Sequence, residues 1–186
     1  MNKSKTIRII GGSLKNSKIR IAEEGIKPTT DRVRVTLFNW LHAWIANKRV
    51  LDLFAGSGIL GLEALSRDSE EVIFIERSKK ASMALDQQLA KFQIDNYKNK
   101  QVDAIQFLKQ KNKEARFDII FLDPPYGSYA INEILSLIII NNWIVKKGYV
   151  FYESNVPLDL KVVEPLWNIY RKSKAGKVYY YLLCCN

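Results

Sequence analysis

Apolar and polar positions along this chain predict strands and helices in turn. The run Val50–Phe54 is apolar except for one residue, which is typical of a buried parallel strand. It breaks at the glycine-containing stretch Ala55–Gly58, and apolar residues then return at helical spacing over Ile59–Leu65. The same alternation continues downstream. We expect further strands at Val72–Glu76, Lys100–Val102, Phe117–Asp123 and Tyr149–Glu153, and helices at Ser78–Phe92, Ala104–Lys111 and Ile131–Ile140.

Strands and helices that alternate at this pitch specify an α/β fold, with a mostly parallel sheet covered by helices on both faces. The two ends of the chain follow another pattern. Near the N-terminus, Thr6–Ile10 and Lys18–Ala22 flank a stretch rich in Gly, Ser and Asn, which predicts a β-hairpin. Near the C-terminus, strand-like segments follow one another without a long helix, which predicts an antiparallel hairpin: Leu160–Val163, Tyr170–Arg171 and Lys177–Cys184.

A further helix is predicted between the N-terminal hairpin and the first parallel strand. Apolar residues there fall on a single stripe, at Val33, Leu37, Trp40, Leu41, Trp44 and Ile45. Aromatic residues at this spacing belong to a core more often than to a base-stacking surface, so we expect Trp40 and Trp44 to be buried.

Length and composition narrow the class of protein. With 186 residues, 47% of them hydrophobic, the chain can bury the core of one domain. No stretch approaches the length of a membrane span, and the lysine-bearing N-terminus lacks the apolar core of a signal peptide. The two cysteines, Cys184 and Cys185, are adjacent and no His/Cys cluster exists, so we expect no disulfide, no metal site and a cytoplasmic location.

The net charge of +10 is concentrated near the N-terminus, because residues 1–49 carry +8 of it and residues 50–186 carry +2. Clustered cations of this kind suit a nucleic-acid backbone, and Arg8, Lys15, Lys18 and Arg20 decorate the predicted hairpin. Arg32 and Arg34 lie in the first turn of the next helix, where they oppose the helix dipole. A phosphate partner, or ion pairs with Asp31 or Glu23, would each explain that placement.

Acidic residues end four of the predicted parallel strands. They are Asp52, Glu76, Asp103 and Asp123. In doubly wound sheets the ligand lies over the carboxyl ends of the strands, where the strand order reverses. Glu76 follows Gly56 by 20 residues, the separation at which an acid binds the hydroxyls of a ribose. Asp103 is placed to receive the exocyclic amine of an adenine.

Two cofactor classes compete for this arrangement. Gly56–Gly61 matches the dinucleotide pattern G-x-G-x-x-G, but one such match is weak evidence. Asp52 would place negative charge beside a pyrophosphate, whereas it suits the ammonium group of a methionine moiety. The fourth strand ends in Asp123-Pro124-Pro125-Tyr126, which has no role in hydride transfer. Both features favour S-adenosylmethionine.

The Asp-Pro-Pro-Tyr sequence suits the methylation of an exocyclic amine on a nucleobase. The lone pair of such an amine is delocalised into the ring, so the amine must be held and polarised. Prolines lack an amide N–H, and the Asp123 carboxylate with the neighbouring carbonyls can accept both N–H groups of the amine. The ring of Tyr126 can stack on a flipped-out base. The sulfonium methyl is already activated, so alignment supplies most of the catalysis.

These motifs resemble those of class I S-adenosylmethionine-dependent methyltransferases. The N-terminal half narrows the resemblance, because Arg8–Gly12, Pro28–Arg34 and Thr36–Asn39 are similar to segments of the bacterial RsmD family. That family methylates N2 of one guanine in 16S ribosomal RNA. Two positions depart from its pattern: Asn16 stands where a glycine is frequent, and Val35 where an acidic residue is usual.

The resemblance implies a Rossmann-like fold with a seven-stranded, mostly parallel sheet. It implies an RNA-contacting hairpin over residues 1–27 and a methyltransferase domain over residues 28–186, acting on the small ribosomal subunit or its precursor. We expect the protein to be a monomer. Catalytic roles fall on Asp123, Pro124, Pro125 and Tyr126. Cofactor contacts fall on Asp52, Phe54, Ala55, Gly56, Ser57, Gly58, Glu76, Arg77, Asp103, Ala104 and Asp123. RNA contacts fall on Arg8, Lys15, Lys18, Arg20, Thr30, Arg32 and Arg34.

Two other functions stay open on the sequence. An adenine-N6 methyltransferase acting on DNA or RNA would use the same Asp-Pro-Pro-Tyr sequence, and only the N-terminal segment argues against it. A nucleic-acid-binding protein with a degenerate cofactor fold is the other, and the intact set of four acids argues against that.

Overall fold

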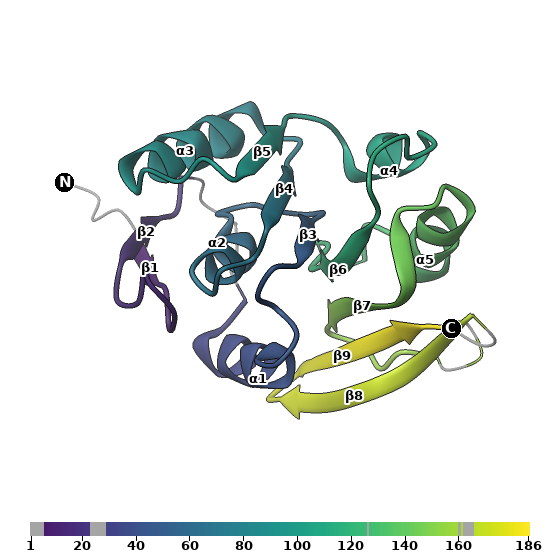
Figure 1. Cartoon of the computed structure of the whole chain (residues 1–186). Coiled ribbons are helices and arrows are strands. Elements are labelled where there is room, and N and C mark those ends of the chain that lie inside the picture. The colour runs from purple at the N-terminus through teal and green to yellow at the C-terminus, as the bar shows by residue number, and fades with distance from the viewer. Residues whose placement is uncertain (1–5, 23–28, 126, 160, 162–165) are drawn as a thin grey trace.

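A seven-stranded sheet with helices on both faces forms the body of the protein, as the computed structural model shows (Figure 1). The structure describes residues 6–22, 29–125, 127–159, 161 and 166–186. The strands are β1 (Thr6–Arg8), β2 (Lys18–Arg20), β3 (Arg49–Asp52), β4 (Glu71–Ile75), β5 (Tyr97–Lys100), β6 (Phe117–Leu122), β7 (Ile144–Ser154), β8 (Trp167–Ala175) and β9 (Val178–Cys185). The helices are α1 (Asp31–Leu41), α2 (Ile59–Leu65), α3 (Lys79–Lys91), α4 (Ala104–Leu108) and α5 (Ile131–Ile140).

The sheet has the order β5-β4-β3-β6-β7-β9-β8, which confirms the predicted α/β class. The first five strands in this order, β5, β4, β3, β6 and β7, are parallel to one another. Strand β9 lies between β7 and β8 and is antiparallel to both. The chain therefore starts in the middle of the sheet at β3, builds outward to β5, and then crosses to β6 on the other side of β3. This reversal brings the carboxyl ends of β3 and β6 side by side.

Helices α1, α2 and α3 cover one face of the sheet, and α4 and α5 cover the other. Successive residues of the buried strands point to opposite faces, so Val50 packs with α1 and α2 while Leu51 packs with α4 and α5. This explains why the central strands are apolar on both sides. Among the described residues, no helix is long and apolar enough to cross a membrane.

The β1–β2 hairpin forms part of the core on the α1 face. Ile9 and Ile19 are buried in the same apolar cluster as Leu37 of α1 and Leu60 of α2. A two-stranded ribbon is marginal by itself, and this contact supplies the apolar surface that it lacks. The described part of the hairpin is thus continuous with the body of the protein.

Two local predictions are wrong, and a third is confirmed with longer bounds. The strand expected at Lys100–Val102 is β5, at Tyr97–Lys100, because its sequence Tyr-Lys-Asn-Lys lacks an apolar run at the edge of the sheet. Helix α1 ends at Leu41, so Trp44 lies beyond it and is 48% exposed. Tyr170–Arg171 belongs to the longer strand β8. The segment expected at Leu160–Val163 falls almost entirely outside the described residues.

Candidate functional site

The four predicted acids all lie at or shortly after the carboxyl ends of parallel strands. Asp52 is the last residue of β3, Glu76 follows β4, Asp103 follows β5, and Asp123 follows β6. Since these strands are parallel neighbours, their carboxyl ends lie along one edge of the sheet. The fold therefore gathers the four carboxylates on the side where ligands bind in doubly wound sheets.

The loop after β3 turns tightly into α2. Gly58 caps α2 with a φ of 74°, a left-handed conformation that suits glycine. A Cβ at this position would lie 2.4 Å from Cδ1 of Leu85 on α3, so a side chain has no room there. The last glycine of the pattern, Gly61, packs on the Phe74 ring, where a Cβ would lie 2.1 Å from the ring. Both glycines bring the loop and α2 close to the neighbouring elements, and Ala55 and Ser57, which precede Gly58 in the loop, are buried.

Asp52 lies at the centre of the site and is 3% exposed. Its Oδ2 accepts a hydrogen bond from the Gly61 amide at 2.9 Å. Burial raises its pKa from the ordinary 3.8 to about 7, and the negative charges of Asp123 and Glu76 add to this effect. None of the described ion pairs provides this carboxylate with a cation. The site is therefore suited to a positively charged ligand group.

Glu76 ties the glycine loop to α3. Its Oε2 accepts from the Gly56 amide at 2.8 Å, and its Oε1 accepts from the Ser78 amide at 2.7 Å. Ser78 is also the N-cap of α3. An ionised carboxylate has about four acceptor positions, so these two bonds leave capacity for the hydroxyl groups of a ligand.

The Asp103 carboxylate caps α4 and also accepts a hydrogen bond from the loop after β6. Its Oδ1 caps α4 by accepting from the amides of Ile105 and Gln106, at 2.9 and 3.1 Å, and Ala104 begins that helix. Its Oδ2 accepts from the Tyr129 hydroxyl at 3.1 Å.

Tyr129 is a site residue that the sequence reasoning missed. Phe54 lies in the loop after β3, and the centroid of its ring is 5.0 Å from the centroid of the Tyr129 ring. Burial, followed by its bond to Asp103, raises the pKa of Tyr129, while the positive charge of Arg77 acts in the opposite direction. Tyr129 therefore links the loop after β6 to the predicted cofactor residues Phe54, Arg77 and Asp103. No spacing or motif in the sequence distinguishes it.

The segment after β6 places Asp123 beside α1. Oδ2 of Asp123 accepts a hydrogen bond from Oγ1 of Thr29 at 2.7 Å, across 94 residues of sequence. Pro124 is buried and Pro125 is exposed. The Pro125 carbonyl, one of the carbonyls predicted as acceptors for the amine, accepts from the Ser128 amide at 3.1 Å. Tyr126, the predicted stacking residue, lies outside the described residues.

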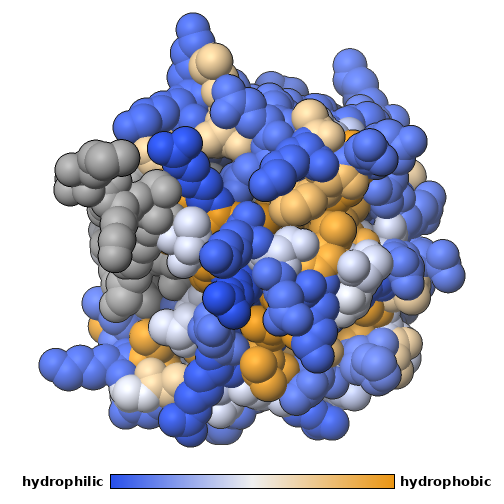
Figure 2. All heavy atoms as spheres, turned by 90° about the vertical axis from the view of Figure 1, so that its left-hand side faces the viewer, coloured by the Kyte–Doolittle hydropathy of each residue, from blue (hydrophilic) through white to orange (hydrophobic). Residues whose placement is uncertain are grey.

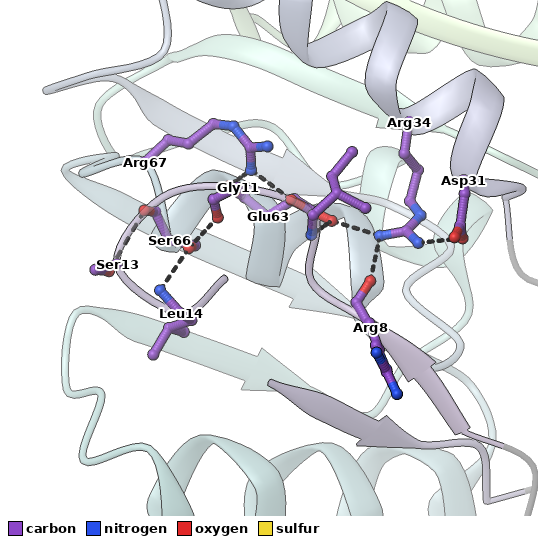
Figure 3. A network of polar contacts seen from close by, with 10 residues as sticks. Arg8, Gly11, Ser13, Leu14, Asp31, Arg34, Glu63, Ser66 and Arg67 are labelled. Atoms are coloured by element: carbon purple, nitrogen blue, oxygen red, sulfur yellow. Dashed lines mark hydrogen bonds and ion pairs between the residues drawn. The ribbon is translucent and has the colours of Figure 1, made fainter. Parts of the chain in front are cut away.

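Arg34 corrects one RNA-contact prediction. It is fully buried, and its guanidinium donates to Glu63 and, at 2.6 Å, to Asp31 (Figure 3). It also donates at 2.9 Å to the backbone carbonyl of Arg8. Of the two explanations for an arginine in the first turn of α1, the structure selects the ion pair. A fully enclosed guanidinium cannot reach a phosphate in this conformation.

Glu63 of α2 is the centre of this buried network, which holds the hairpin against the body (Figure 3). Besides Arg34, it accepts from the guanidinium of Arg67 and, at 2.8 Å, from the amide of Ile10. Ser66 extends the same contact, because its hydroxyl donates to the Gly11 carbonyl at 2.6 Å and accepts from the Leu14 amide at 2.9 Å. On the far side of the hairpin, the Arg20 amide donates to Gln88 of α3 at 2.6 Å.

The remaining predicted RNA-contact residues lie on the surface. Thr30 is exposed and caps α1, its hydroxyl accepting from the Val33 amide at 3.5 Å. The face of the molecule that carries the β1–β2 hairpin is largely hydrophilic, as Figure 2 shows. Asn16 in the hairpin turn has a φ of 69°, a left-handed conformation that asparagine adopts more readily than most residues with a side chain. The exposed cations of this region are Arg8, Lys15, Lys18, Arg20 and Arg32.

No group of side chains in the described ranges could hold a metal ion. What the carboxyl edge can do chemically follows from its donors and acceptors. It can hold a cationic, hydroxyl-bearing ligand through Asp52 and Glu76, and it places a further carboxylate, Asp123, beside that ligand.

Comparisons of this chain with protein families, with known proteins and with solved structures all identify the same family. The family described as Conserved hypothetical protein 95 matches residues 7–184. The chain is 40% identical over 177 residues to Ribosomal RNA small subunit methyltransferase D of Escherichia coli, covering 95% of this chain and 88% of the relative. It is 34% identical over 185 residues to the protein of the same name from Buchnera aphidicola, covering 99% and 96%. A solved structure described as "Putative methyltransferase yhhF from Escherichia coli" superposes with a TM-score of 0.87 at 36% identity, covering 97% of this chain and 98% of that one.

Proposed function

Because the chain belongs to the RsmD family, we propose that it transfers a methyl group from S-adenosylmethionine to the exocyclic N2 amine of a guanine in 16S ribosomal RNA. The observation that carries this proposal is the juxtaposition of Asp52 and Asp123. The charge of Asp123 contributes to the raised pKa of Asp52, so the carboxylate suited to a cationic cofactor and the carboxylate of the Asp-Pro-Pro segment act on one region.

The residues at the carboxyl edge fit the proposed cofactor. S-adenosylmethionine carries a sulfonium, an ammonium group and a ribose, and it supplies an activated methyl group when bound. Asp52 offers negative charge to the cationic methionine end, and Glu76 offers acceptors to the ribose hydroxyls. Phe54 and Tyr129 present rings beside Asp103, the position proposed for the adenine. Arg77 and Ala104, which are also predicted to contact the cofactor, are assigned to the adenine end of the site near Asp103.

Asp123 and the Pro124 carbonyl are proposed to accept the two N–H groups of the target amine. Neither proline has an N–H that could compete with the amine for these acceptors. Holding both N–H groups directs the nitrogen lone pair toward the methyl group, and Tyr126 is proposed to stack on the base. A bond forms between this nitrogen and the methyl carbon as the carbon–sulfur bond breaks. The proton lost from the nitrogen is released to water, with S-adenosylhomocysteine as the other product.

The exposed cations of the hairpin and of the first turn of α1 are proposed to bind the RNA backbone. The hairpin is held to α2 through Glu63 and to α3 through Gln88, and these helices flank the glycine loop. RNA bound by the hairpin would therefore be held at a fixed position relative to the cofactor residues.

The test is a transfer assay with S-adenosylmethionine labelled in its methyl group. The substrates are small ribosomal subunits from cells that lack this modification, naked 16S RNA, and DNA. N2-methylguanosine in the subunit RNA supports the proposal, and the Asp123→Ala variant should then bind cofactor but transfer no label. Label in adenine would replace the proposed substrate by the N6-amine alternative. Cofactor binding without label in any nucleic acid would support the binding-protein alternative.

A further inference from the structure

Thr29 lies immediately before the N-cap of α1 and is 2% exposed. Its hydroxyl donates to Oδ2 of Asp123 at 2.7 Å, a short bond that joins α1 to the segment after β6. A carboxylate only accepts hydrogen bonds, so the direction of this bond is fixed when Asp123 is ionised. The contact links two segments that are 94 residues apart in the chain.

The hydroxyl of Thr29 is not needed to start the helix. Thr30 is the N-cap of α1, and its own hydroxyl accepts from the Val33 amide. A buried hydroxyl without a partner would cost free energy, and Thr29 meets this requirement through Asp123. Its polar group is thus directed to the carboxylate rather than to its own helix.

Rotation about the last side-chain torsion of an aspartate is weakly restricted, so the plane of a carboxylate follows its hydrogen bonds. The Thr29 bond fixes Oδ2 of Asp123, and with it the direction of the remaining acceptor positions. The donor is itself held on a rigid element, because α1 is anchored by the Arg34–Glu63 ion pair and by the packing of Trp40 on Tyr180.

We propose that Thr29 is a positioning residue, which orients the Asp123 carboxylate for the amine that is methylated. This role rests on the proposed function. A hydrogen bond from a neutral donor to a charged carboxylate stabilises one orientation of that carboxylate. Losing the bond should therefore lower turnover by about 10- to 100-fold. The loss should fall on kcat, because Thr29 has no assigned contact with the cofactor or the RNA backbone.

The central variant is Thr29→Val, which keeps the shape of the side chain and removes the hydroxyl. We expect kcat on small subunits to fall about 10- to 100-fold, with KM for the subunit and Kd for S-adenosylmethionine unchanged within about twofold. Thr29→Ser keeps the hydroxyl and should recover activity to within about threefold of wild type. Thr36→Val is the matched control, since it removes a hydroxyl from α1 that donates to the Arg32 carbonyl and accepts from the Tyr180 hydroxyl.

A second measurement tests the bond without using the substrate. Thr29→Val should lower the urea midpoint of unfolding in the wild-type background but not in the Asp123→Ala background, where the hydroxyl has lost this acceptor. Equal shifts in the two backgrounds would overturn the proposal. So would a Thr29→Val enzyme with wild-type kcat, or a Thr29→Ser enzyme as slow as Thr29→Val. If the wild-type chain methylates no RNA, the proposed function itself fails, and the role of Thr29 fails with it.

Discussion

Replacement of Asp52 by Asn should stabilise the fold at neutral and alkaline pH while it weakens cofactor binding. Asn keeps an oxygen that can accept from the Gly61 amide, and it removes a charge that is buried without a cationic partner among the described ion pairs. The pKa of Asp52 is raised from 3.8 to about 7 in the folded state, chiefly by burial. The folded protein therefore binds a proton that the unfolded chain releases, and stability is lost as the pH rises through this interval.

The size of the effect follows from the shift of about three pKa units. At about 1.4 kcal/mol per unit, the charged form of Asp52 costs the fold up to about 4 kcal/mol above pH 7. The cost falls toward zero below about pH 3, where the carboxyl is protonated in both states. Between pH 5 and pH 8 the stability advantage of Asp52→Asn should grow by about 2 to 3 kcal/mol.

The assay is urea unfolding of wild type and Asp52→Asn at pH 5 and pH 8, without cofactor. Comparing the two pH values removes any constant difference between the side chains, and Asp86→Asn serves as a control at an exposed carboxylate of α3. Calorimetric titration with S-adenosylmethionine at pH 8 should show affinity reduced by at least tenfold in Asp52→Asn. A difference in unfolding free energy that does not change with pH, or a variant less stable than wild type at pH 8, would refute the electrostatic reasoning.

Three further predictions concern the hairpin and the cofactor end. Arg34→Met leaves the Glu63 carboxylate buried with one cation fewer, so urea unfolding should show a loss of about 3 to 5 kcal/mol; an unchanged midpoint would mean that the ion pair is not formed. Lys18→Ala should leave unfolding unchanged but reduce the slope of log Kd for RNA against log salt by about 0.7 to 0.9, whereas Lys109→Ala, at the end of α4 on the opposite face of the sheet, should not; equal slopes in both variants would argue against the hairpin as the RNA surface. Tyr129→Phe removes the hydroxyl bonded to Asp103 and should weaken cofactor binding several-fold by titration without changing the methylated base; tighter binding would show that this bond competes with the cofactor.

The sequence predicts the central sheet well because apolar runs and glycines report burial and tight turns directly. Helix α5 has the predicted bounds, Ile131–Ile140, and β6 ends one residue before the predicted end. The predicted third strand fails because β5 lies at the sheet edge, where polar residues serve as well as apolar ones. The four acids could be placed at one edge from topology alone, since every parallel strand presents its carboxyl end there.

Tertiary partners could not be predicted in the same way. Arg34 has the charge of an RNA-binding residue, and only the fold shows that it is buried in an ion pair with Glu63. Thr29 and Tyr129 meet Asp123 and Asp103 across long stretches of chain, and their types are common in turns and loops. A pattern in sequence reports the environment of a residue along its own element. The partner of a polar side chain depends on which elements lie opposite, and a single sequence does not encode that in its local spacing.

Helix α1 connects the two halves of the proposed reaction. At its N-terminus, Thr29 holds the Asp123 carboxylate, and one turn later Arg34 binds both Glu63 and the backbone of the hairpin. An apolar side chain at position 34 could fill the same space, but it could not donate to the Arg8 carbonyl. Buried ion pairs contribute little net stability compared with apolar packing, yet they define geometry through directed bonds. This network therefore serves a fold in which the hairpin proposed to bind RNA, the glycine loop ahead of α2 and Asp123 must keep fixed positions relative to one another.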